Sequence, residues 1–352
     1  YLNRGNNNNN MKKLFLVDKL LFVINSLFAT ILLLSYLLPF IAPSRFSSIS
    51  IMSLVVPLLI LINLFFGIFW IIKLKRQFIL STLVLLIGFQ QVNSLYQIAE
   101  KKVLLTEDIK IMSYNVRLFN LHTVKKINEE KMIIHVEGFV KNQDPDILCF
   151  QEYVSTLTTS FNYPYKYIDK NISTKNPYFG QAIFSKYRII NSGSLNFDDS
   201  INNAIFIDVI KKTDTIRVYN IHLESQRIKL DKENLGEENS EKLIQRLQNT
   251  FKKQEIQARQ LIAHETNCNY NIIISGDFNN TAFSWVYKKI KGSKQDTFTE
   301  AGKGFGKTYD YLFPSRIDFI LVDDNFTVNN YKTFKYDFSD HFPIMARVNL
   351  TK

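Results

Sequence analysis

Three long stretches without a charged residue lie near the start of the chain, and they constrain its fold more than any other feature. They cover residues 20–44, 46–72 and 77–99 and are rich in Leu, Ile, Phe and Val. A helix of about 20 apolar residues is long enough to cross the hydrocarbon core of a bilayer. Hydropathy therefore predicts a membrane anchor over residues 19–99. The expected transmembrane helices, about three in number, are 20–43, 51–72 and 77–98.

The third stretch is the weakest of these predictions. Its C-terminal half contains Gln90, Gln91, Asn93 and Gln97, whose polar side chains are costly in hydrocarbon. Two spans followed by a juxtamembrane helix are the alternative. The orientation of the rest of the chain depends on this one segment.

The segment before the first apolar stretch resembles the charged start of a signal peptide, because Met11 is followed by Lys12 and Lys13. The apolar run is long, no small-residue cleavage site follows it, and further apolar segments come directly after. An uncleaved anchor is therefore the better interpretation. Residues 1–18 are expected to be a disordered cytoplasmic segment, with Met11 a plausible true start.

The short loops between the apolar stretches indicate an orientation. Lysines flank the first span, and Lys73, Lys75 and Arg76 separate the second from the third, whereas the first loop holds only Arg45. Positive charge stays on the cytoplasmic side. With three spans, everything after about residue 100 lies outside the cytoplasm. The expected location is therefore a bacterial inner membrane, multi-pass, with a periplasmic domain.

The net charge and the two cysteines set weaker limits on function. The formal net charge of +11 favours anionic partners such as nucleic acid or phospholipid headgroups, although part of it comes from lysines beside the membrane spans. Cys149 lies in an apolar run, where an inert core thiol is expected, and Cys268 lies in a polar one; two such cysteines do not indicate a disulfide framework or a zinc knuckle. No protein partner can be inferred.

After a linker at residues 100–107, residues 108–352 show the pattern of one domain of mixed helices and strands. Apolar, β-branched runs typical of strands recur along it. They are 109–116, 146–151, 180–190, 203–210, 215–222, 271–276, 316–322 and 343–350. Helical spacing of apolar residues predicts helices near 125–141 and 240–264, and the charged residues 226–240 are expected to form a loop.

Short polar clusters stand at the ends of six of these apolar runs. They are Ser113–Asn115, Gln151–Glu152, Asn220–His222, Gly276–Asn279, Arg316–Asp318 and Ser339–Pro343. Each cluster supplies carboxylates, amides or imidazoles, which are the groups that metal-assisted hydrolysis of a phosphate ester requires. Six such clusters in one chain indicate a catalytic site assembled from strand ends.

Two of these clusters contain carboxylates, Glu152 and Asp277, that are candidates for the site. Glu152 is suited to bind Mg²⁺, which prefers one or two carboxylates, although a solvated strand-end residue is the simpler reading of that position alone. Asp277 and Asn279 follow the apolar run Ile272–Ile274, and their spacing predicts side chains on one face of an extended segment. Gly276 is expected to let the chain turn there, and a structural Asx turn is the alternative.

The histidines provide the remaining candidates. Asp340 and His341 precede Pro343, and an imidazole oriented by a carboxylate is a common acid–base arrangement. Asp318 lies among apolar neighbours and needs a partner, for which His341 is the candidate. His222 follows a strand, where it is either a site residue or a satisfied surface histidine.

In order and spacing, the six clusters resemble those of the endonuclease/exonuclease/phosphatase superfamily, which includes DNase I-like nucleases, abasic-site endonucleases, inositol polyphosphate 5-phosphatases and neutral sphingomyelinases. The resemblance covers about residues 108–350. It implies an α+β fold, a four-layer α/β/β/α sandwich, here preceded by the N-terminal transmembrane region. The whole pattern, membrane helices followed by this domain, also resembles a group of bacterial membrane proteins whose substrates are poorly defined. After Asn115 the chain runs Val116-Arg117-Leu118, where abasic-site endonucleases tend to carry a small or acidic residue, and this departure makes DNA repair a less favoured function.

The resemblance also implies roles for single residues. Glu152 would be the main ligand of Mg²⁺ (with Mn²⁺ possible), Asn115 would hold or bridge to the metal shell, and Asp340 would lie near it. His222 and Asn279 would contact the phosphate. Asp277 would orient or deprotonate the attacking water, and Asp318 would pair with His341. Whether Asp277 or His341 is the general base stays open.

One further motif is rejected. Residues 301–308 fit a relaxed phosphate-binding P-loop, but the preceding residues are polar and no helix is expected to follow. They are expected to form a rim loop, in which Lys303 or Lys307 has a small chance of touching an anionic substrate.

The sequence as a whole predicts a membrane-anchored, Mg²⁺-dependent phosphoesterase that hydrolyses phosphodiester bonds of nucleic acid or of a phospholipid or sphingomyelin headgroup. Its partners would be the bilayer and this anionic substrate. A non-catalytic binding module with the same fold is one alternative. A phosphomonoesterase acting on a phosphorylated small molecule or inositol phosphate is the other.

Overall fold

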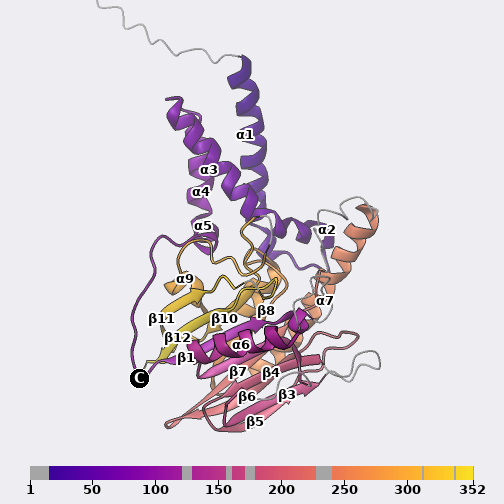
Figure 1. Cartoon of the computed structure of the whole chain (residues 1–352). Helices are drawn as coiled ribbons and strands as arrows, with labels where there is room; N and C mark the ends of the chain where they lie inside the picture. The colour runs from indigo at the N-terminus through magenta and orange to yellow at the C-terminus, as the bar shows by residue number, and fades with distance from the viewer. Residues whose placement is uncertain are drawn as a thin grey trace, which may run out of the picture.

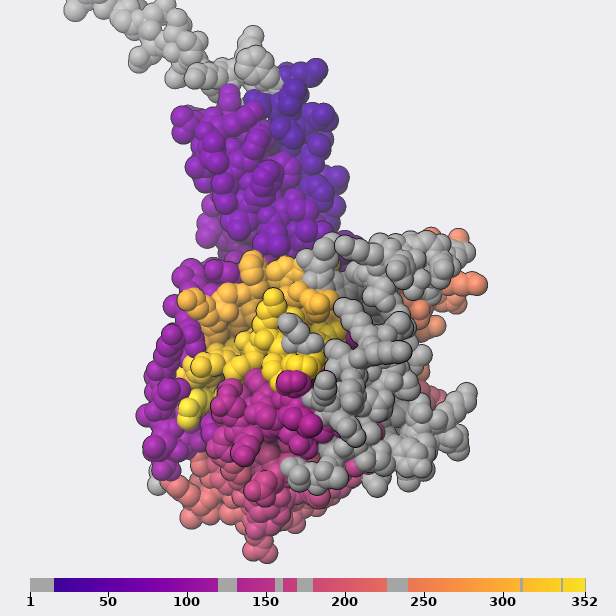
Figure 2. Space-filling view, viewed as in Figure 1, coloured from indigo at the N-terminus to yellow at the C-terminus, as the bar shows by residue number. Residues whose placement is uncertain are grey.

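The computed structural model describes residues 16–120, 129–155, 161–170, 179–226, 240–310, 313–336 and 338–351. Figure 1 shows a bundle of N-terminal helices standing on a sandwich of two β-sheets. In the space-filling view of Figure 2, this bundle forms a column directly above the orange and yellow C-terminal segments of the sandwich.

The N-terminal bundle contains α-helices and short 3₁₀ helices. In order they are α1 (Leu16–Ser35), η1 (Leu38–Phe40), α2 (Ser47–Ser50), η2 (Ile51–Leu54), α3 (Val56–Ile72), α4 (Phe78–Ile87) and α5 (Phe89–Leu95). Among the described residues, one helix, Leu16–Phe40, is long and apolar enough to cross a membrane alone. Ser47–Ile72 and Phe78–Leu95 qualify only if each bent pair of helices counts as one span, with bends of 55° and 81°.

Gly88 lies at the sharper bend, between α4 and α5, and it packs closely against Tyr36. A Cβ atom at this position would lie 2.1 Å from the ring of Tyr36, so only glycine allows the close approach. The Tyr36 hydroxyl also donates to the carbonyl of Val84 at 3.0 Å. Helix α1 is thus fixed against the end of α4.

A buried polar network joins the three long helices. Asn25 donates to Ser81 at 2.7 Å and accepts from the indole of Trp70 at 2.9 Å, and Ser81 donates to Asn63 at 3.3 Å. All four side chains are buried, whereas most of the large exposed apolar side chains of the described chain lie between residues 16 and 105. The bundle therefore buries a polar network beside an apolar cluster and exposes many large apolar side chains, which is unlike the surface of a water-soluble bundle.

The sandwich consists of two six-stranded mixed sheets. The first has the order β11-β12-β1-β2-β4-β3 and the second β5-β6-β7-β8-β10-β9. The first-sheet strands are β1 (Ile109–Asn115), β2 (Ile147–Val154), β3 (Tyr165–Lys170), β4 (Phe179–Ser185), β11 (Phe326–Thr333) and β12 (Ile344–Leu350). The second-sheet strands are β5 (Ile189–Ser194), β6 (Ala204–Lys211), β7 (Asp214–His222), β8 (Asn271–Asp277), β9 (Gln295–Asp296) and β10 (Asp318–Val322). The pairs β1–β2 and β7–β8 are parallel, and the other pairs are antiparallel.

Side-chain alternation along the strands builds the four layers. In β8, Ile273 points into the core between the sheets, while Ile272 and Ile274 point outward to the helices. Helix α6 (Glu129–Gln143) covers the outer face of the first sheet, and α7 (Ser240–Thr266) with α8 (Trp285–Lys291) covers that of the second. This is the α/β/β/α sandwich expected from the sequence.

Several elements differ from the sequence-based expectation. The run 180–190 is not one strand, because it ends as β4 at Ser185 and resumes as β5 in the other sheet. Strands β3, β9 and β11 and helices α8 and α9 (Thr297–Ala301) were not predicted. Residues 125–128 of the first predicted helix and most of the predicted loop 226–240 lie outside the described residues.

The bundle is joined to the sandwich by specific contacts. Phe283 of the sandwich is buried among the N-terminal helices, and Phe305 packs against the same cluster. Thr281 donates to the carbonyl of Ser53 at 3.0 Å, and the backbone N–H of Ser44 donates to Glu255 at 2.7 Å. The sandwich therefore carries apolar surface that the N-terminal helices cover.

Candidate active site

Strand alternation brings the predicted residues to one end of the space between the two sheets. Asn115, His222, Asp277 and Asp318 each continue the inward-facing series of their strand, two or four residues from an isoleucine or valine of the central core. Because β7 and β8 are parallel, His222 and Asp277 are also direct neighbours in register. The apolar core thus ends in a polar cluster at these strand ends.

Glu152 reaches the same place by a local irregularity. The pairing of β2 with β4 slips by one residue between Phe150 and Tyr153, and Glu152 has a positive φ of 50°. A β-bulge of this kind turns a side chain away from its regular face. Without it, alternation would place Glu152 on the helix-covered face beside Phe150. The bulge is the strained feature that directs this carboxylate to the site.

Three predicted site residues converge on one oxygen of Asp277. Asn115 Nδ2 donates to Asp277 Oδ2 at 3.1 Å, and the Nε2 atoms of His222 and His341 lie 3.7 Å from it. The other oxygen, Oδ1, accepts from the backbone N–H of Asn279 at 2.7 Å. Asp277 is buried, with 1% of its surface exposed. It is the centre of the cluster.

His341 forms the predicted pair with Asp318. His341 Nδ1 lies 3.0 and 3.2 Å from the two carboxylate oxygens of Asp318, and both residues are buried. Asp318 lies directly opposite Asp277 on the neighbouring antiparallel strand. The imidazole of His341 therefore stands between two carboxylates, with one nitrogen directed to each.

This arrangement shifts the pKa values in opposite directions. Burial lowers the pKa of His341, but the charges of Asp318 and Asp277 outweigh it and raise the pKa to about 10. Burial raises the pKa of Asp277 to about 7; the charge of His341 opposes this increase and that of Asp318 adds to it. The two carboxylates therefore favour the cationic form of His341, and burial favours the protonated form of Asp277.

His222 is a buried histidine with an unsatisfied nitrogen. Its Nε2 has no hydrogen-bond partner among the described residues and lies 3.8 Å from Glu152 Oε1. Burial, and then the charge of His341, lower the pKa of His222 to about 3, so the ring is neutral at pH 7. A buried polar atom without a partner is uncommon. It indicates a site for a ligand oxygen next to Glu152 and Asp277.

Two expectations about the Gly276–Asn279 segment were wrong. Asp277 and Asn279 do not lie on one face of an extended segment, because Asn279 has a positive φ of 48° and its N–H closes an Asx turn onto Asp277. Gly276 does not turn the chain, since β8 continues to Asp277. A Cβ at Gly276 would lie 2.0 Å from the carbonyl oxygen of Ile221, so glycine permits the close approach of β7 and β8.

Asn279 itself lies at the margin of the cluster. Its side-chain amide donates to the carbonyl of Leu223 at 2.8 Å, directly after His222. Its backbone carbonyl accepts from Gln226 at 2.9 Å. These contacts join the loop after β8 to the loop after β7.

Asp340 lies on the open side of the cluster, where its side chain is 26% exposed. Arg117 Nε is 3.4 Å from Asp340 Oδ2, so this arginine, which the sequence analysis treated only as a departure, belongs to the rim. Ser339 donates to the carbonyl of Asn115 at 2.9 Å and ties the loop to β1.

Two neighbours of the Asp318–His341 pair were missed. The hydroxyl of Thr308 accepts from the backbone N–H groups of Ile317 and Asp318, and the ring of Tyr309 contacts that of His341 edge-on at 4.8 Å between centroids. Thr308 ends the rejected P-loop segment and Tyr309 follows it, and no helix follows among the described residues before β10. The position of this segment beside His341 had no signal in the sequence.

Other residues of the six clusters are structural. Gln151 donates to Asn220 at 2.6 Å and to Ser113 at 3.1 Å, which links the two sheets beneath the site. Arg316 pairs with Asp296 at 2.7 Å and lies between the rings of Phe298 and Phe319. These buried polar groups hold the strands in register rather than face a substrate.

The residues fit a divalent cation of the hard type. Burial raises the pKa of Glu152, whose hydrogen bond from Asn115 Nδ2 is long at 3.4 Å, so its carboxylate is poorly compensated and suits a cation. Asn115 turns its amide nitrogen to Glu152 and Asp277, while its oxygen accepts from the N–H of Arg117. In this arrangement Asn115 bridges the carboxylates. Within the described residues, Asp277, Asp318 and His341 also form a group whose ligand atoms lie within 4.8 Å of one another.

The two mixed sheets bring carboxylates and histidines together at one edge, an arrangement suited to metal-assisted hydrolysis of phosphate esters. The sequence profile described as "Endonuclease/Exonuclease/phosphatase family" matches residues 112–341, and the chain belongs to this family. Enzymes of the family generally use divalent metal ions. A profile for a domain of unknown function, DUF8431, matches residues 18–95. No curated protein sequence matches the chain.

Solved structures show the same fold. An endonuclease/exonuclease/phosphatase from Bacteroides vulgatus superposes with a TM-score of 0.53 and 18% identity, covering 69% of this chain and 99% of that one. TDP2 from D. rerio, complexed with a single-strand DNA product, gives 0.52 and 16%, covering 69% and 99%. The catalytic domain of human Nocturnin with bound sulfate gives 0.51 and 16%, covering 74% and 98%. Identity at this level is evidence for the fold alone.

Proposed function

We propose that this phosphoesterase is a Mg²⁺-dependent phosphodiesterase, with Asp277 as the proton acceptor and His341 as a cationic donor to the phosphoryl oxygens. The observation that carries the proposal is the convergence of Asn115, His222 and His341 on Asp277 Oδ2. A carboxylate with a pKa near 7 is suited to take a proton from water at neutral pH. An imidazolium with a pKa near 10 is not a base and instead stabilises negative charge.

The other residues then take the roles implied by the family. The neutral His222 offers its unsatisfied Nε2 to a phosphate oxygen. Asn279, the second phosphate contact that the family implies, now donates its side-chain amide to the carbonyl of Leu223 and would have to release that bond to reach the phosphate. Glu152, with Asp340 near it and Asn115 bridging, would hold Mg²⁺. When bound, the metal ion neutralises phosphate charge and helps the leaving oxygen. Asp318 fixes the orientation and charge of His341.

We further propose that residues 19–99 form a multi-pass anchor in a bacterial inner membrane and that the sandwich, from residue 108 on, lies on the periplasmic side. Lys73 pairs with Asp18 at the end of the bundle that points away from the sandwich (Figure 1). Lys75 and Arg76 follow in the same turn, which places the basic loop on the far side from the catalytic domain. Since positive loops stay in the cytoplasm, this supports the orientation.

The proposal is tested on the full chain in detergent or nanodiscs, because truncation before residue 103 would expose Phe283 and Phe305. Hydrolysis of an aryl phosphodiester and an aryl phosphomonoester would be measured with Mg²⁺ and with EDTA. We expect Mg²⁺-dependent turnover of the diester and a loss of 10²- to 10⁴-fold in Asp277→Asn. Asp324→Asn, an exposed isosteric change, is the control.

A wild-type protein that turns over neither ester, and that Asp277→Asn does not alter, would support a binding module instead. Faster hydrolysis of the monoester would support the phosphomonoesterase alternative. The intact set of Glu152, Asp277 and His341 argues against loss of catalysis.

A further inference from the structure

One buried backbone carbonyl beside the catalytic cluster accepts two side-chain hydrogen bonds. It is the carbonyl of Leu223, the residue that follows His222. Asn279 Nδ2 donates to this oxygen at 2.8 Å and Asn202 Nδ2 donates to it at 3.0 Å. Leu223 and Asn202 are both buried. A carbonyl oxygen has two lone pairs, so it can accept both bonds at once, and either amide alone would still satisfy it.

The backbone of Asn279 is fixed independently of its side-chain amide. Its N–H donates to Asp277 Oδ1 at 2.7 Å. Its carbonyl accepts from Gln226 at 2.9 Å and from Gln254, a fully buried residue of α7, at 3.2 Å. Release of the amide from the Leu223 carbonyl therefore requires only rotation of the Asn279 side chain.

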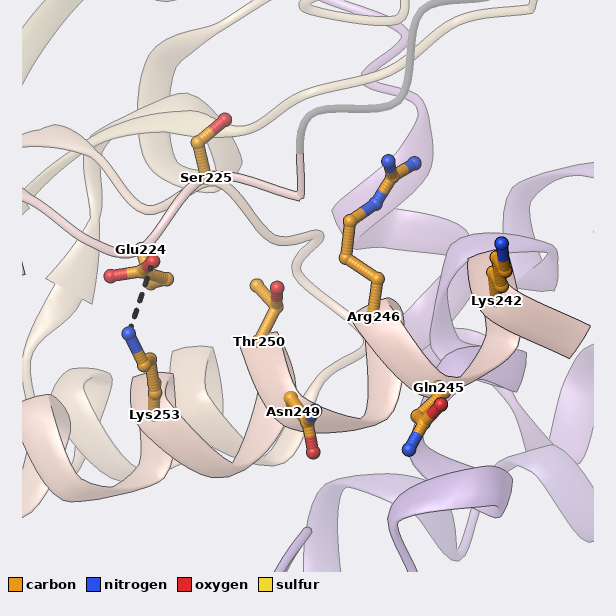
Figure 3. A pocket seen from close by; sticks show the side chains of 8 residues that line it. All are labelled: Glu224, Ser225, Lys242, Gln245, Arg246, Asn249, Thr250 and Lys253. Carbon is orange, nitrogen blue, oxygen red and sulfur yellow. Dashed lines mark ion pairs between the residues drawn. The ribbon is translucent and has the colours of Figure 1, made fainter. Parts of the chain in front are cut away.

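The segment that carries the Leu223 carbonyl is fixed as well. The next residue, Glu224, donates its N–H to Gln257 at 2.8 Å, and its carbonyl accepts from Gln254 at 2.7 Å. Figure 3 shows this segment beside α7, where Lys253 is paired with the carboxylate of Glu224 at 3.6 Å. The Leu223 carbonyl is thus held in place when one of its two donors leaves.

The second donor lowers the cost of releasing Asn279. If Asn279 were the sole donor to this carbonyl, its release would leave a buried acceptor unsatisfied, which would weaken phosphate binding by roughly 5- to 150-fold. With Asn202 in place, the carbonyl keeps one hydrogen bond. The Asn279 amide then exchanges a neutral acceptor for a charged phosphate oxygen, to which hydrogen bonds are stronger.

We propose that Asn202 is a positioning residue for the phosphate side of the site. By holding the Leu223 carbonyl, it allows the amide of Asn279 to turn from that carbonyl to a phosphate oxygen of the substrate. The proposal rests on the proposed function, in which Asn279 and the neutral His222 contact the phosphate. Asn202 itself does not touch the substrate and acts through Asn279.

The sharing of the carbonyl is tested first, by stability in the absence of substrate. Denaturant unfolding of the full chain in detergent would be measured for Asn202→Ala, Asn279→Ala and the double variant. Because either amide satisfies the carbonyl, we expect the double variant to lose more stability than the two single losses added together. Asn330→Ala is the matched control, since its buried amide donates to the carbonyl of Lys101 at 2.7 Å on the edge strand β11. Combined with Asn279→Ala, its loss should be additive.

The positioning role is tested by kinetics on an aryl phosphodiester with saturating Mg²⁺. We expect Asn202→Ala to raise KM about tenfold and to change kcat less than twofold, because the cost falls on binding of the phosphate. In the Asn279→Ala background, the same change should alter KM less than twofold, since no amide remains to be released. Asn330→Ala should keep both constants within twofold of wild type.

Several results would overturn the proposal. Additive stability losses, or a single variant that does not fold, would show that the two amides do not replace each other on the carbonyl. An unchanged KM in Asn202→Ala would show that Asn279 does not need the second donor. A KM increase of the same factor in both backgrounds, or a loss confined to kcat, would mean that Asn202 only supports the structure.

Failure of the proposed function gives a different pattern. If the wild type does not hydrolyse the diester, the phosphodiesterase proposal fails, and binding of inorganic phosphate with Mg²⁺ then decides the role of Asn202. Its dissociation constant should rise at least fivefold in Asn202→Ala but not in Asn330→Ala, and equal constants would overturn the role. If the diester is hydrolysed and Asn279→Ala leaves KM unchanged, Asn202 loses its role while the phosphodiesterase activity stands.

Discussion

The charge on His341 depends on Asp318, and Asp318→Asn tests this directly. In the wild type, His341 Nδ1 lies 3.0 Å from a carboxylate oxygen of Asp318. Asparagine has nearly the same size and keeps an oxygen that can accept from this nitrogen. The substitution removes the negative charge that, with Asp277, raises the pKa of His341 against the effect of burial. The pKa of His341 should then fall toward or below its ordinary value.

The size of the effect follows from the two pKa values. In the wild type, a pKa of about 10 leaves His341 fully protonated at pH 8. With an ordinary pKa of about 6.5, roughly 3% of the imidazole would be protonated at pH 8 and about three quarters at pH 6. If the reaction needs the imidazolium, kcat/KM should fall about thirtyfold at pH 8 but less than twofold at pH 6.

The assay is the pH dependence of kcat/KM on an aryl phosphodiester, from pH 5.5 to 9.5, for the full chain in detergent. The wild-type profile should rise through about pH 7, as Asp277 loses its proton, and stay high to beyond pH 9. The variant should show a bell with a descending limb near neutral pH. Asp324→Asn makes the same chemical change at an exposed residue, and this control should keep the wild-type profile.

Two outcomes would refute the reasoning. A loss of the same factor at every pH would mean that Asp318 only positions the ring. A ratio of variant to wild-type activity that rises with pH would mean that neutral His341 is the working form and therefore the base.

Three further outcomes follow from the structure. Glu152→Gln should raise the Mg²⁺ concentration for half-maximal activity at least tenfold, measured by titrating metal into EDTA-stripped protein; an unchanged midpoint would remove Glu152 from the metal site. Burial, and then the charge of His341, lower the pKa of His222 to about 3 in the folded chain. As the pH falls below about 6.5, His222 binds a proton in the unfolded chain but not in the folded one, so the free energy of unfolding decreases. Glutamine does not titrate, so the free energy of unfolding of His222→Gln, relative to that of wild type, should rise by about 2 kcal/mol from pH 8 to pH 5 in denaturation experiments. A difference between the two proteins that is the same at both pH values would contradict the low pKa. Phe283 is 4% exposed and packs among the N-terminal helices, so Phe283→Ala should lower the free energy of unfolding by about 3 kcal/mol. Phe89 is 63% exposed, and Phe89→Ala should change thermal unfolding in detergent little. Equal losses of stability would mean that Phe283 does not join the bundle to the sandwich.

The parts of the fold that the sequence predicted are those in which burial decides the pattern. Strand β8 is a short run of three β-branched isoleucines next to Ser275 and Gly276, and α7 is a long segment with apolar residues at helical spacing, so length and composition identify each. The missed elements lack that signal. Strand β3 reads Tyr-Lys-Tyr-Ile-Asp-Lys, and it lies at a sheet edge where one neighbour suffices.

Strand β11 was missed for a different reason. Two of its buried residues are Asn329 and Asn330, which bind Asp108 and Glu100 far away in the sequence. From the sequence alone, two adjacent asparagines in the middle of an apolar run indicate a loop rather than a strand. The partners that make it a strand come from the segment before β1.

The candidate site shows the same division. That Asn115, His222, Asp277 and Asp318 share an edge follows from strand ends and alternation, which are local properties. That Glu152 joins them does not, because the bulge at Glu152 depends on its pairing with β4. The Asx turn at Asn279 and the contacts of Thr308 and Tyr309 are likewise tertiary.

The choice between Asp277 and His341 as the base depends on a register that no local pattern contains. Asp318 lies opposite Asp277 only because β10 runs antiparallel to β8 with that one alignment. A slip of a single residue would turn Asp318 to the other face of the sheet and leave His341 with one carboxylate. With two carboxylates, the imidazole keeps its proton, and the acid left near its midpoint is Asp277. The chemistry proposed for each residue is therefore a consequence of strand pairing, and the Asp318→Asn profile tests that pairing as well as the mechanism.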